Sequence, residues 1–368
     1  MAPTRVLVVD DSALMRKLLT TILAQDPEIE IVGTATDPVA AKRALAQLSP
    51  DVMTLDIEMP RMNGIEFLEQ LMKHRPMPVV MVSSLTERGS QLTMRALQLG
   101  AFDFVTKPKI DIARGTVELA EELVAKVKAA GRSRGRRPVA RPKSRPPARP
   151  VSLRPQPGSF AQQALIAIGA STGGTEALSK VLSAFPANCP PCIVVQHMPP
   201  VFTRHFAERL DRECRVHVRE AQDGDVLTPG LVLIAPGGER HMQLTRAGSR
   251  LTVQLVAMPP VNHHRPSVDV LFDSVARVAG ASTIAAILTG MGADGARGMK
   301  KLRDAGAQTV AQDEATSVVF GMPKEAIALG GAAHVAPLSD IAATLLRLAG
   351  DTRRRDSLRV SNPPRGAP

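Results

Sequence analysis

The stretches RVLVVDDS at residues 5–12 and LIAIGASTGG at residues 165–174 set the expected architecture of this 368-residue chain. Each is a short apolar run that ends in a polar or glycine-rich turn, a pattern typical of a buried strand in a parallel sheet. Comparable runs follow each stretch and alternate with amphipathic segments. The length also fits about two domains of ~150 residues each. The sequence therefore predicts two α/β domains, each beginning with one of these strands.

The first 129 residues alternate five apolar runs with five amphipathic segments. Strands are expected at residues 5–9, 29–33, 52–55, 79–82 and 102–105, and helices at residues 13–24, 38–47, 64–73, 90–99 and 117–129. This alternation predicts a doubly wound parallel sheet with helices on both faces, in three layers. Functional groups of such sheets lie beyond the carboxyl ends of the strands.

The alternation resumes in residues 161–350. Strands are expected at residues 165–168, 193–196, 231–235, 283–288 and 309–311, and helices at residues 174–183, 201–211, 268–278 and 296–305. A hairpin is expected near residues 242–256. The second domain is therefore also predicted to be a doubly wound, three-layer α/β domain.

Basic residues are concentrated outside the two predicted domains. The net charge is +11, but residues 132–157 hold nine Arg or Lys, seven Pro and no acid. Residues 351–368 hold five Arg and two Asp, a further +3. Subtracting both segments from the total leaves −1 for all other residues. We therefore expect a basic Pro/Arg-rich linker at residues 130–160 and a basic disordered tail at residues 351–368.

Composition argues against several classes of protein. With nine Phe and no Trp or Tyr, the chain lacks the aromatic platforms of single-stranded nucleic-acid binders. Three cysteines are too few for a disulfide framework. No window has the ~18 uninterrupted apolar residues of a membrane span, and acids interrupt the first apolar run. We expect a cytoplasmic protein that binds no nucleic acid and inserts into no membrane.

Polar side chains follow four of the predicted strands in the first domain. Asp10 and Asp11 follow the first strand, Asp56 the third, Ser83 the fourth and Lys107 the fifth. Converging carboxylates repel one another unless a cation balances them, and oxygen ligands suit Mg²⁺. The set predicts a Mg²⁺ and phosphoryl-transfer site in which one carboxylate attacks the donor. The alternative is that these Asp residues only cap the following helices.

This domain resembles the response-regulator receiver family. The resemblance rests on LVVDDS, LDIEMPRMNG, VVMVSS and FDFVTKP and covers about 125 residues. It implies that Asp56 is the phosphorylated residue and that a histidine kinase is the phosphodonor. The resemblance also implies roles for the surrounding residues: Asp10, Asp11, Asp56 and the Glu58 carbonyl hold Mg²⁺, Ser83 and Phe104 form the switch, and Lys107 binds phosphate.

Three reactive side chains follow strands of the second domain. Ser171 lies in GASTGG, His197 ends CIVVQHM, and Asp294 follows a strand in LTGMGADG. Because parallel strands end at one edge of a sheet, the three are expected to converge there as nucleophile, general base and orienting carboxylate. Each residue alone allows another interpretation: a phosphate-binding turn, a structural histidine or a helix cap.

The second domain closely resembles the catalytic domain of CheB-type protein-glutamate methylesterases. The resemblance covers roughly residues 161–347 and rests on AIGASTGGTEAL, VVQHMPPVFTRHFAERL, LIAPGGERHM, RPSVDVLFDSVA, LTGMGADGARGM and QDEATSVVFGMPKEAI. It implies the triad Ser171, His197 and Asp294, with the backbone N–H groups of Thr172 and Met291 near the oxyanion. It implies no cofactor for the ester chemistry.

The implied function is adaptation in chemotaxis. The resemblance implies a phosphorylation-activated monomer that hydrolyses glutamyl methyl esters on the cytoplasmic helices of methylated chemoreceptors and deamidates receptor glutamines. The unphosphorylated first domain is expected to cover the triad. Two alternatives stay open: a transcriptional regulator whose basic linker contacts DNA, and a non-catalytic receptor-binding scaffold. Cys189–Cys192 is interpreted as structural or incidental. His263–His264 is not expected to bind a metal, and whether the pair borders the substrate site stays open.

Overall fold

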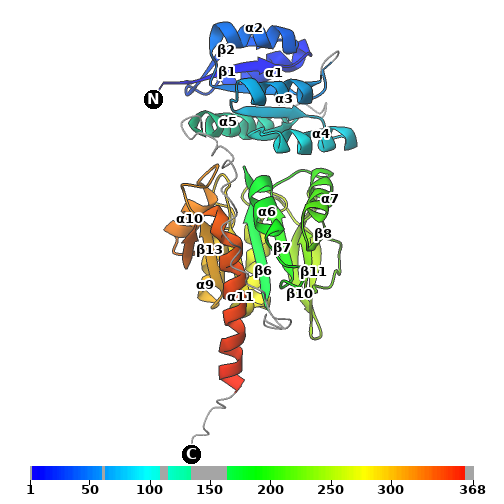
Figure 1. Cartoon of the computed structure of the whole chain (residues 1–368), viewed down its shortest axis with the longest axis vertical. Helices are drawn as coiled ribbons and strands as arrows, with labels where there is room; N and C mark the ends of the chain where they lie inside the picture. The colour runs from blue at the N-terminus through cyan, green and yellow to red at the C-terminus, as the bar shows by residue number, and fades with distance from the viewer. Residues whose placement is uncertain (1, 60–62, 108–114, 134–163, 361–368) are drawn as a thin grey trace, which may run out of the picture. The chain divides into compact units, whose positions relative to one another are not determined.

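The computed structural model describes residues 2–59, 63–107, 115–133 and 164–360. Its contacts divide the chain into two compact units, residues 1–150 and 151–368 (Figure 1). Each unit is built on its own parallel sheet with helices on both faces. The predicted fold class, two doubly wound α/β domains, is confirmed. The predicted linker, residues 130–160, is wrong for residues 130–133, because a helix continues through them to Ser133. The rest of it lies outside the described residues and stays a prediction.

The first unit has a five-stranded sheet in the order β2-β1-β3-β4-β5. Every neighbouring pair of strands is parallel. Its elements are β1 (Thr4–Val9), α1 (Ala13–Ala24), β2 (Ile29–Ala35), α2 (Pro38–Leu48), β3 (Val52–Asp56), α3 (Gly64–His74), β4 (Val79–Ser83), α4 (Glu87–Gln98), β5 (Asp103–Thr106) and α5 (Gly115–Ser133).

Burial and capping explain these elements. The central strands β3 and β4 are buried at every residue, as continuous apolar runs between two helical layers should be. Ser12, Asp37 and Thr86 cap α1, α2 and α4 by accepting hydrogen bonds from backbone N–H groups of the first turn. Helices α1 and α5 contact each other on one face, and α3 and α4 on the other. All ten predicted elements are present.

The second unit has a seven-stranded sheet in the order β14-β13-β12-β6-β7-β9-β8, again with parallel neighbours. Its strands are β6 (Leu165–Ala170), β7 (Cys192–Gln196), β8 (His217–Glu220), β9 (Leu231–Ile234), β12 (Thr283–Ile287), β13 (Gln308–Gln312) and β14 (His334–Ala336). Its helices are α6 (Gly174–Ser183), α7 (Phe202–Glu213), α8 (Val268–Val278), α9 (Ala296–Asp304), α10 (Met322–Ala328) and α11 (Leu338–Val360), with a 3₁₀ turn at Gly280–Ser282.

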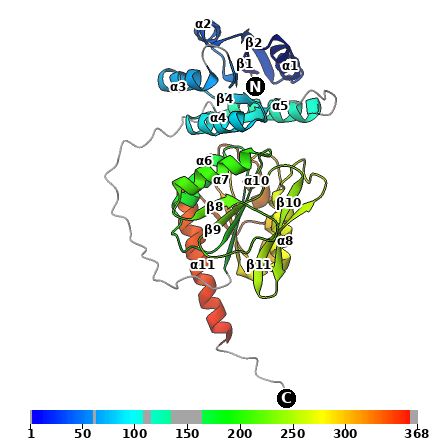
Figure 2. The same cartoon turned by 90° about the vertical axis from the view of Figure 1, so that its right-hand side faces the viewer.

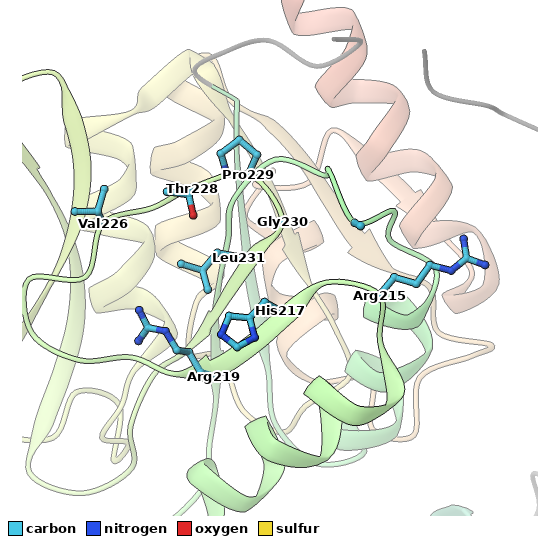
Figure 3. A pocket seen from close by; sticks show the side chains of 9 residues that line it. Arg215, His217, Arg219, Val226, Thr228, Pro229, Gly230 and Leu231 are labelled. Atoms are coloured by element: carbon cyan, nitrogen blue, oxygen red, sulfur yellow. The ribbon is translucent and has the colours of Figure 1, made fainter. Parts of the chain in front are cut away.

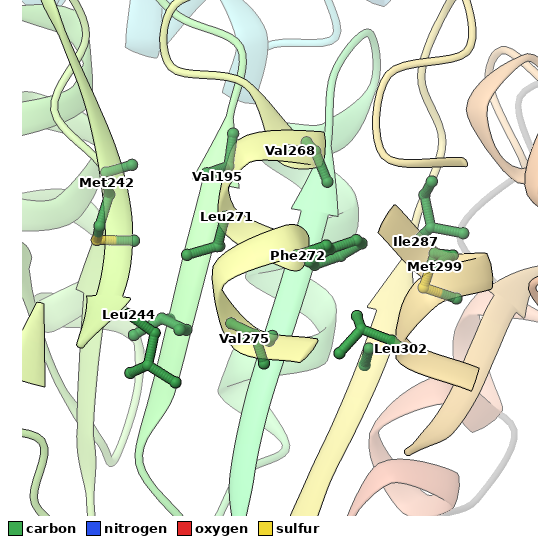
Figure 4. Close-up of a cluster of buried hydrophobic side chains, with 14 of the residues drawn as sticks. Val195, Met242, Leu244, Val268, Leu271, Phe272, Val275, Ile287, Met299 and Leu302 are labelled. Atoms are coloured by element: carbon green, nitrogen blue, oxygen red, sulfur yellow. The ribbon is translucent and has the colours of Figure 1, made fainter. Parts of the chain in front are cut away.

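The predicted hairpin is also present. Strands β10 (Arg240–Ala247) and β11 (Arg250–Ala257) pair antiparallel, and β10 contacts α8 (Figure 2). Met242 and Leu244 of the hairpin belong to the same buried cluster as Phe272 of α8 and Met299 of α9 (Figure 4). A buried side chain of this kind contributes about 1.5–3 kcal/mol, so this cluster fixes α8 between the hairpin and the sheet.

Two edge strands, two helices and one chain end differ from expectation. No helix was predicted at α10 or α11. Strands β8 and β14 were not predicted, since each is short and β8 buries only Val218. The predicted disordered tail at residues 351–368 is wrong for its first ten residues, because α11 continues to Val360. Those ten residues contain neither Pro nor Gly, and Arg favours helix, so high charge alone does not end the helix. Residues 361–368 lie outside the described residues.

The order of strands in the second sheet determines where a site can form. From β6 the chain proceeds to β7 on one side and returns later to β12 on the other side. A crevice forms beyond the carboxyl ends of strands at such a reversal, and ligands of open α/β sheets bind there. Ser171, His197 and Asp294 follow β6, β7 and β12 respectively.

Candidate active site

Ser171 and His197 are brought together by strand register. Ala170 of β6 pairs with Gln196 of β7, so the two residues that follow the pair leave the sheet side by side. The backbone N–H of His197 donates to the Ala170 carbonyl at 3.2 Å. On the other side, the Ser171 N–H donates to the Thr289 carbonyl beyond β12 at 3.0 Å. Ser171 therefore lies between the ends of β7 and β12.

The imidazole of His197 is paired with Asp294. His197 Nε2 lies 2.8 Å from Asp294 Oδ2, and the two side chains are 7% and 1% exposed. An ionised carboxylate only accepts hydrogen bonds, so Nε2 carries the proton and the neutral ring leaves Nδ1 as an acceptor. Nδ1 is buried and has no hydrogen-bond partner among the described residues. Nδ1, not Nε2, is therefore the ring nitrogen left free to accept a proton.

Asp294 lies at the amino end of α8. Its Oδ1 accepts from Ser267 Oγ at 2.7 Å and from the Asp269 N–H at 3.3 Å, and its Oδ2 accepts from the Val268 N–H at 2.6 Å. Burial by itself would raise the pKa of this carboxyl, but hydrogen bonds from His197, Asn262 and Ser267 outweigh it and hold the pKa well below its usual range. Asp294 therefore stays ionised and orients the imidazole.

The turn after β6 is held open by small residues and one amide. Gln196 Nε2 donates to the Ser171 carbonyl at 3.0 Å. A Cβ added at Gly290 would lie 2.9 Å from Ser171 Cβ, so only glycine fits beside the serine. Gly173 adopts φ +76°, a left-handed conformation that glycine favours, and α6 begins directly after it.

Two backbone N–H groups are available beside Ser171. Within the described parts of the chain, the amides of Thr172 and Met291 donate to no acceptor. Thr172 begins the turn before α6, and Met291 lies in the loop after β12. Free amides at a turn that leads into a helix can stabilise an oxyanion.

Several neighbours of the triad were not predicted as functional. The ring of His264 stacks on that of His197 with centroids 3.7 Å apart and planes inclined by 16°. Asn262 and Ser267 donate to Asp294, and Gln196 fixes the serine turn. Ser267 directly precedes the apolar run of α8, which is a capping signal. Asn262 and His264 contact residues that are far from them in the sequence, and no local sequence pattern predicts such contacts.

The cysteine pair has no sign of reactivity. Cys189 and Cys192 are buried free thiols. Burial raises the pKa of Cys189 to about 12 and also raises that of Cys192. Both groups stay protonated at neutral pH, whereas a redox pair needs a thiolate.

The first unit has an acidic site at the ends of β1 and β3. Ligand oxygens of Asp10, Asp11 and Asp56 lie within 4.8 Å of one another, the only such cluster among the described residues. Lys107 Nζ donates to Asp56 Oδ2 at 2.7 Å and lies 3.5 Å from Asp10 Oδ2. The Glu58 N–H donates to Asp56 Oδ1 at 3.2 Å. The predicted acids and lysine therefore meet at one place.

The electrostatics of this site favour a cation. Burial raises the pKa of Asp56 to about 6 against the opposing effect of Lys107, and burial also raises the pKa of Asp10. Asp10 Oδ2 is buried and makes no hydrogen bond within the described residues. A hard divalent cation would satisfy that oxygen and relieve the repulsion, so the residues fit Mg²⁺.

The two predicted switch residues lie on neighbouring strands. Ser83, at the end of β4, is fully buried and its Oγ accepts from Thr93 Oγ1 of α4 at 2.7 Å. Phe104 of β5 is 4% exposed. Lys126 of α5 lies 5.2 Å from the centre of its ring and donates to its carbonyl at 2.6 Å. Neither side chain is exposed in this structure.

The second unit also has a hollow away from the triad. A cavity of about 620 Å³ lies at the amino ends of β8 and β9, lined by Arg215, His217 and Arg219 among others (Figure 3). His217 pairs with Asp211 at 2.8 Å, and Arg219 pairs with Asp225. These contacts offset much of the positive charge. The triad follows the opposite, carboxyl ends of the strands.

The fold and the two sites define a class of protein: an α/β domain with an acidic, lysine-containing site, followed by an α/β domain with a candidate serine-hydrolase site. Residues 6–115 match the response regulator receiver domain family, and residues 166–345 match the CheB methylesterase family. The chain belongs to the family of CheB-type protein-glutamate methylesterases with a receiver domain.

Relatives match the chain over nearly its full length. The protein-glutamate methylesterase/protein-glutamine glutaminase of Bordetella bronchiseptica is 53% identical over 355 residues, which cover 96% of this chain and 100% of the relative. The protein of the same name from Methylobacillus flagellatus is 53% identical over 359 residues, covering 97% and 99%. The crystal structure of the Thermotoga maritima CheB methylesterase catalytic domain is 41% identical with a TM-score of 0.50, and the match covers 51% of this chain and 100% of that domain.

No helix within the described residues is both long and apolar enough to cross a membrane.

Proposed function

We propose that Ser171, His197 and Asp294 perform ester and amide hydrolysis on glutamyl side chains of chemoreceptors. Family membership establishes the class of enzyme, and the assignment of these residues is our proposal. The observation that carries it is the geometry of His197: Nε2 is held by Asp294 at 2.8 Å, while Nδ1 is buried and unpartnered beside the serine turn. This is the arrangement that a general base needs.

The first half-reaction forms an acyl-enzyme. Ser171 Oγ attacks the side-chain carbonyl carbon of the glutamyl methyl ester, and His197 Nδ1 accepts the hydroxyl proton. The backbone N–H groups of Thr172 and Met291 stabilise the negative oxygen, each worth about 10²–10³-fold in rate. The bond to the methoxy oxygen then breaks, and Nδ1 returns its proton so that methanol leaves.

The second half-reaction releases the product. Water replaces methanol and attacks the acyl carbon while His197 Nδ1 accepts its proton. The bond to Ser171 Oγ then breaks and Nδ1 returns the proton to Oγ, which gives a glutamate side chain and restores the serine hydroxyl. A glutamine amide follows the same steps, with ammonia as the leaving group. One triad can therefore serve both reactions.

Methanol release from methylated receptors tests this proposal. We expect Ser171→Ala to abolish release, because the substitution removes the hydroxyl that attacks the ester in the proposed reaction. Thr175→Ser, a small change in α6 outside the proposed machinery, is the control and should retain activity. Methanol release by Ser171→Ala at the wild-type rate would refute the triad. A serine-directed fluorophosphonate should label the wild-type chain at Ser171.

We propose that Asp56 is the phosphoryl acceptor that controls this activity. Asp10, Asp11, Asp56 and the Glu58 carbonyl would hold Mg²⁺, which supplies charge neutralisation for the transferring phosphoryl group. Lys107, already 2.7 Å from Asp56, would bind the added phosphate. Ser83 and Phe104 would then respond to it.

The receiver domain implies a kinase as phosphodonor, and we propose a histidine kinase. Methanol release with and without a small-molecule phosphodonor tests the control. We expect stimulation of the wild-type chain and none of Asp56→Asn. If that variant lost phosphate labelling yet kept the full stimulation, Asp56 would not be the switch. We further propose that the enzyme is a monomer, which sedimentation of the chain can test.

A further inference from the structure

The catalytic carboxylate has a second carboxylate close by. Asp269 of α8 is 4% exposed and accepts from the Gly298 N–H at 2.7 Å. Asn262 Nδ2 donates to Asp294 Oδ1 at 2.7 Å and to Asp269 Oδ2 at 2.8 Å. A single amide nitrogen therefore lies between two buried carboxylates. Like charges this close repel strongly where water is excluded.

The chemistry of its partners fixes the orientation of the Asn262 amide. Its Oδ1 accepts from an Arg297 guanidinium nitrogen at 3.1 Å. Arginine only donates and ionised carboxylates only accept, so the amide nitrogen must face Asp269 and Asp294. The contacts to Arg297, Asp269 and Asp294 all require the same orientation of the amide. Its oxygen and its nitrogen are therefore both hydrogen-bonded.

The backbone places Asn262 at the tip of a tight turn. Asn262 and His263 adopt φ +52° and +65°, and the backbones of Val261 and His264 pair in both directions at 3.0 Å. Asn tolerates this left-handed conformation better than most residues. The turn places Asn262 within hydrogen-bond distance of Asp294 and places the ring of His264 against the face of the His197 ring.

A buried histidine fixes both ends of the segment that carries this turn. His241 is fully buried, its Nε2 donates to the Pro259 carbonyl at 3.0 Å, and its Nδ1 accepts from the Ser267 N–H at 3.1 Å. Both contacts require a neutral ring with the proton on Nε2. The segment from Pro259 to Ser267 is therefore anchored at its base as well as at its tip.

We propose that Asn262 is a positioning residue for the hydrolytic reaction: its side-chain amide separates Asp269 from Asp294 and fixes the carboxylate that orients His197. The inference rests on the proposed roles of His197 and Asp294. Without the amide, Asp294 loses a donor and faces Asp269 directly. The Asp294 carboxylate then rotates or shares a proton with Asp269. In either case the proton of His197 is no longer held on Nε2.

The charged and titratable groups around this contact come from several elements. They are His197 after β7, His241 of β10, His264 and Arg265 in the segment before α8, Asp269 of α8, and Arg297 of α9. Arg297 donates to Asp269 at 3.4 Å and is largely exposed, so it does not replace the amide between the carboxylates.

Two substitutions at position 262 test the proposal in the full-length chain. Asn262→Gly keeps the left-handed backbone and removes the amide. We expect kcat to fall about 10-fold to 100-fold while KM changes less than about twofold, because the substrate contacts are intact and the base is misplaced.

Asn262→Asp is the sharper variant, since it is nearly isosteric but donates only when protonated. Placed between two carboxylates, the introduced group retains its proton to a higher pH than an ordinary Asp. We expect the rate of Asn262→Asp, relative to that of the wild-type chain at the same pH, to fall as pH rises and the introduced carboxyl ionises.

His263→Gly is the matched control. His263 is the adjacent left-handed residue of the same turn, and its side chain makes no hydrogen bond to the described residues. We expect wild-type kcat and pH profile for this variant. Thermal unfolding of all three variants shows whether each is folded at the assay temperature.

A readout that needs no receptor separates this proposal from the proposed function. Nitrogen NMR of His197 should show the Nε2–H tautomer in the wild-type chain and a mixture of tautomers in Asn262→Gly. Fluorophosphonate labelling of Ser171 should slow in the same variant. If the wild-type chain were labelled at Ser171 but released no methanol from receptors, the receptor ester would not be its substrate. The tautomer and labelling tests of Asn262→Gly would still apply. A wild-type pH profile in Asn262→Asp together with unchanged tautomer in Asn262→Gly would overturn the positioning role.

Discussion

The direction in which His197 is held determines which of its nitrogens would act as the base in the proposed reaction. Asp294 binds Nε2, so Nδ1 is left for Ser171. In trypsin-like enzymes the carboxylate binds Nδ1 and the serine meets Nε2, so the ring here is used in the opposite sense. The roles of the three residues are unchanged, because a triad is defined by geometry rather than by atom labels.

Asp294→Asn should abolish most of the activity. The amide would turn an N–H group toward donors that now surround Asp294, including the Val268 N–H at 2.6 Å, and would no longer hold the proton on His197 Nε2. We expect kcat to fall about 10³–10⁴-fold and the melting temperature to fall as well. Methanol release and thermal unfolding measure both. Asp273→Asn, which removes a surface contact to Lys301 from the same region, should leave kcat unchanged.

Asp56 should lower the stability of the receiver domain at neutral pH. Burial raises its pKa to about 6 from its ordinary value of 3.8. The unfolded chain therefore ionises first, and the unfolding free energy falls by up to about 3 kcal/mol as pH rises from about 4 through 6.

Asp56→Asn removes this effect, so we expect the variant to be more stable than wild type at pH 7 and equally stable at pH 4. Denaturant unfolding of the full chain, followed through the receiver transition, measures the difference. Mg²⁺ should stabilise the wild-type chain at pH 7 more than the variant. A variant less stable than wild type at pH 7 would contradict the predicted cost of the buried charge.

Residues that follow strands were predictable, and residues that support them were not. Ser171, His197 and Asp294 each end an apolar run, so the parallel topology alone brings them to one edge. Asn262 lies 32 positions from Asp294 in the sequence, and its contact depends on the folding of the turn and of α8. No periodicity or local motif encodes such a contact.

Three helices of the catalytic unit, α6, α9 and α10, begin after a glycine instead of a capping side chain, and the glycines before α6 and α9 have positive φ values. Gly173 precedes α6 and Gly295 precedes α9, with φ values of +76° and +88°. Each glycine lies one or two residues after a triad member. A capping Ser or Asp would accept from the first-turn amides with its own oxygen. With glycine at this position, the Gly174 N–H donates to the Ser171 carbonyl at 2.7 Å and the Gly298 N–H donates to Asp269 Oδ1 at 2.7 Å.

Gly290→Ala should inactivate the enzyme through packing alone. The added methyl group would lie 2.2 Å from Met322 Sδ and 2.9 Å from Ser171 Cβ, and Met322 is fully buried. The serine turn must shift, and a displacement of about 1 Å costs about 10²-fold in kcat.

Gly248→Ala is the comparison for this change. Gly248 lies between β10 and β11 with φ +60°, and nothing lies within 4 Å of its added Cβ. We expect a loss of stability of about 1 kcal/mol with kcat unchanged. Equal kcat values in the two variants would show that the approach of Gly290 to Ser171 does not matter for catalysis.

The buried strands were predicted well, whereas the two short edge strands and the helices α10 and α11 were not. All five strands of the receiver sheet and the five central strands of the second sheet follow from apolar runs between glycine or polar turns. Strands β8 and β14 have only four and three residues and lie at the two edges. An edge strand with one helix-covered face needs few apolar residues, so its sequence carries little signal.

Most of the net positive charge of the chain lies outside the two sites, so it does not indicate their chemistry. Of the total of +11, residues 132–157 contribute nine and residues 351–368 three. The two sites depend on buried carboxylates, one histidine and one lysine. A high isoelectric point, about 10.1 here, therefore says little about the substrate.

Neutralising the basic residues of 132–157 should show that they affect polyanion binding and not catalysis. We expect replacement of all nine Arg and Lys residues in 132–157 by Gln to weaken retention on a polyanion column. Phosphodonor-stimulated methanol release should stay within about twofold, because polyanion binding depends on exposed cations and the triad uses none of these residues. Scrambling the order of residues 132–157 at constant charge is the control and should keep the retention. Loss of stimulation in the Gln variant alone would show that the charge of this segment takes part in regulation, beyond connecting the two domains.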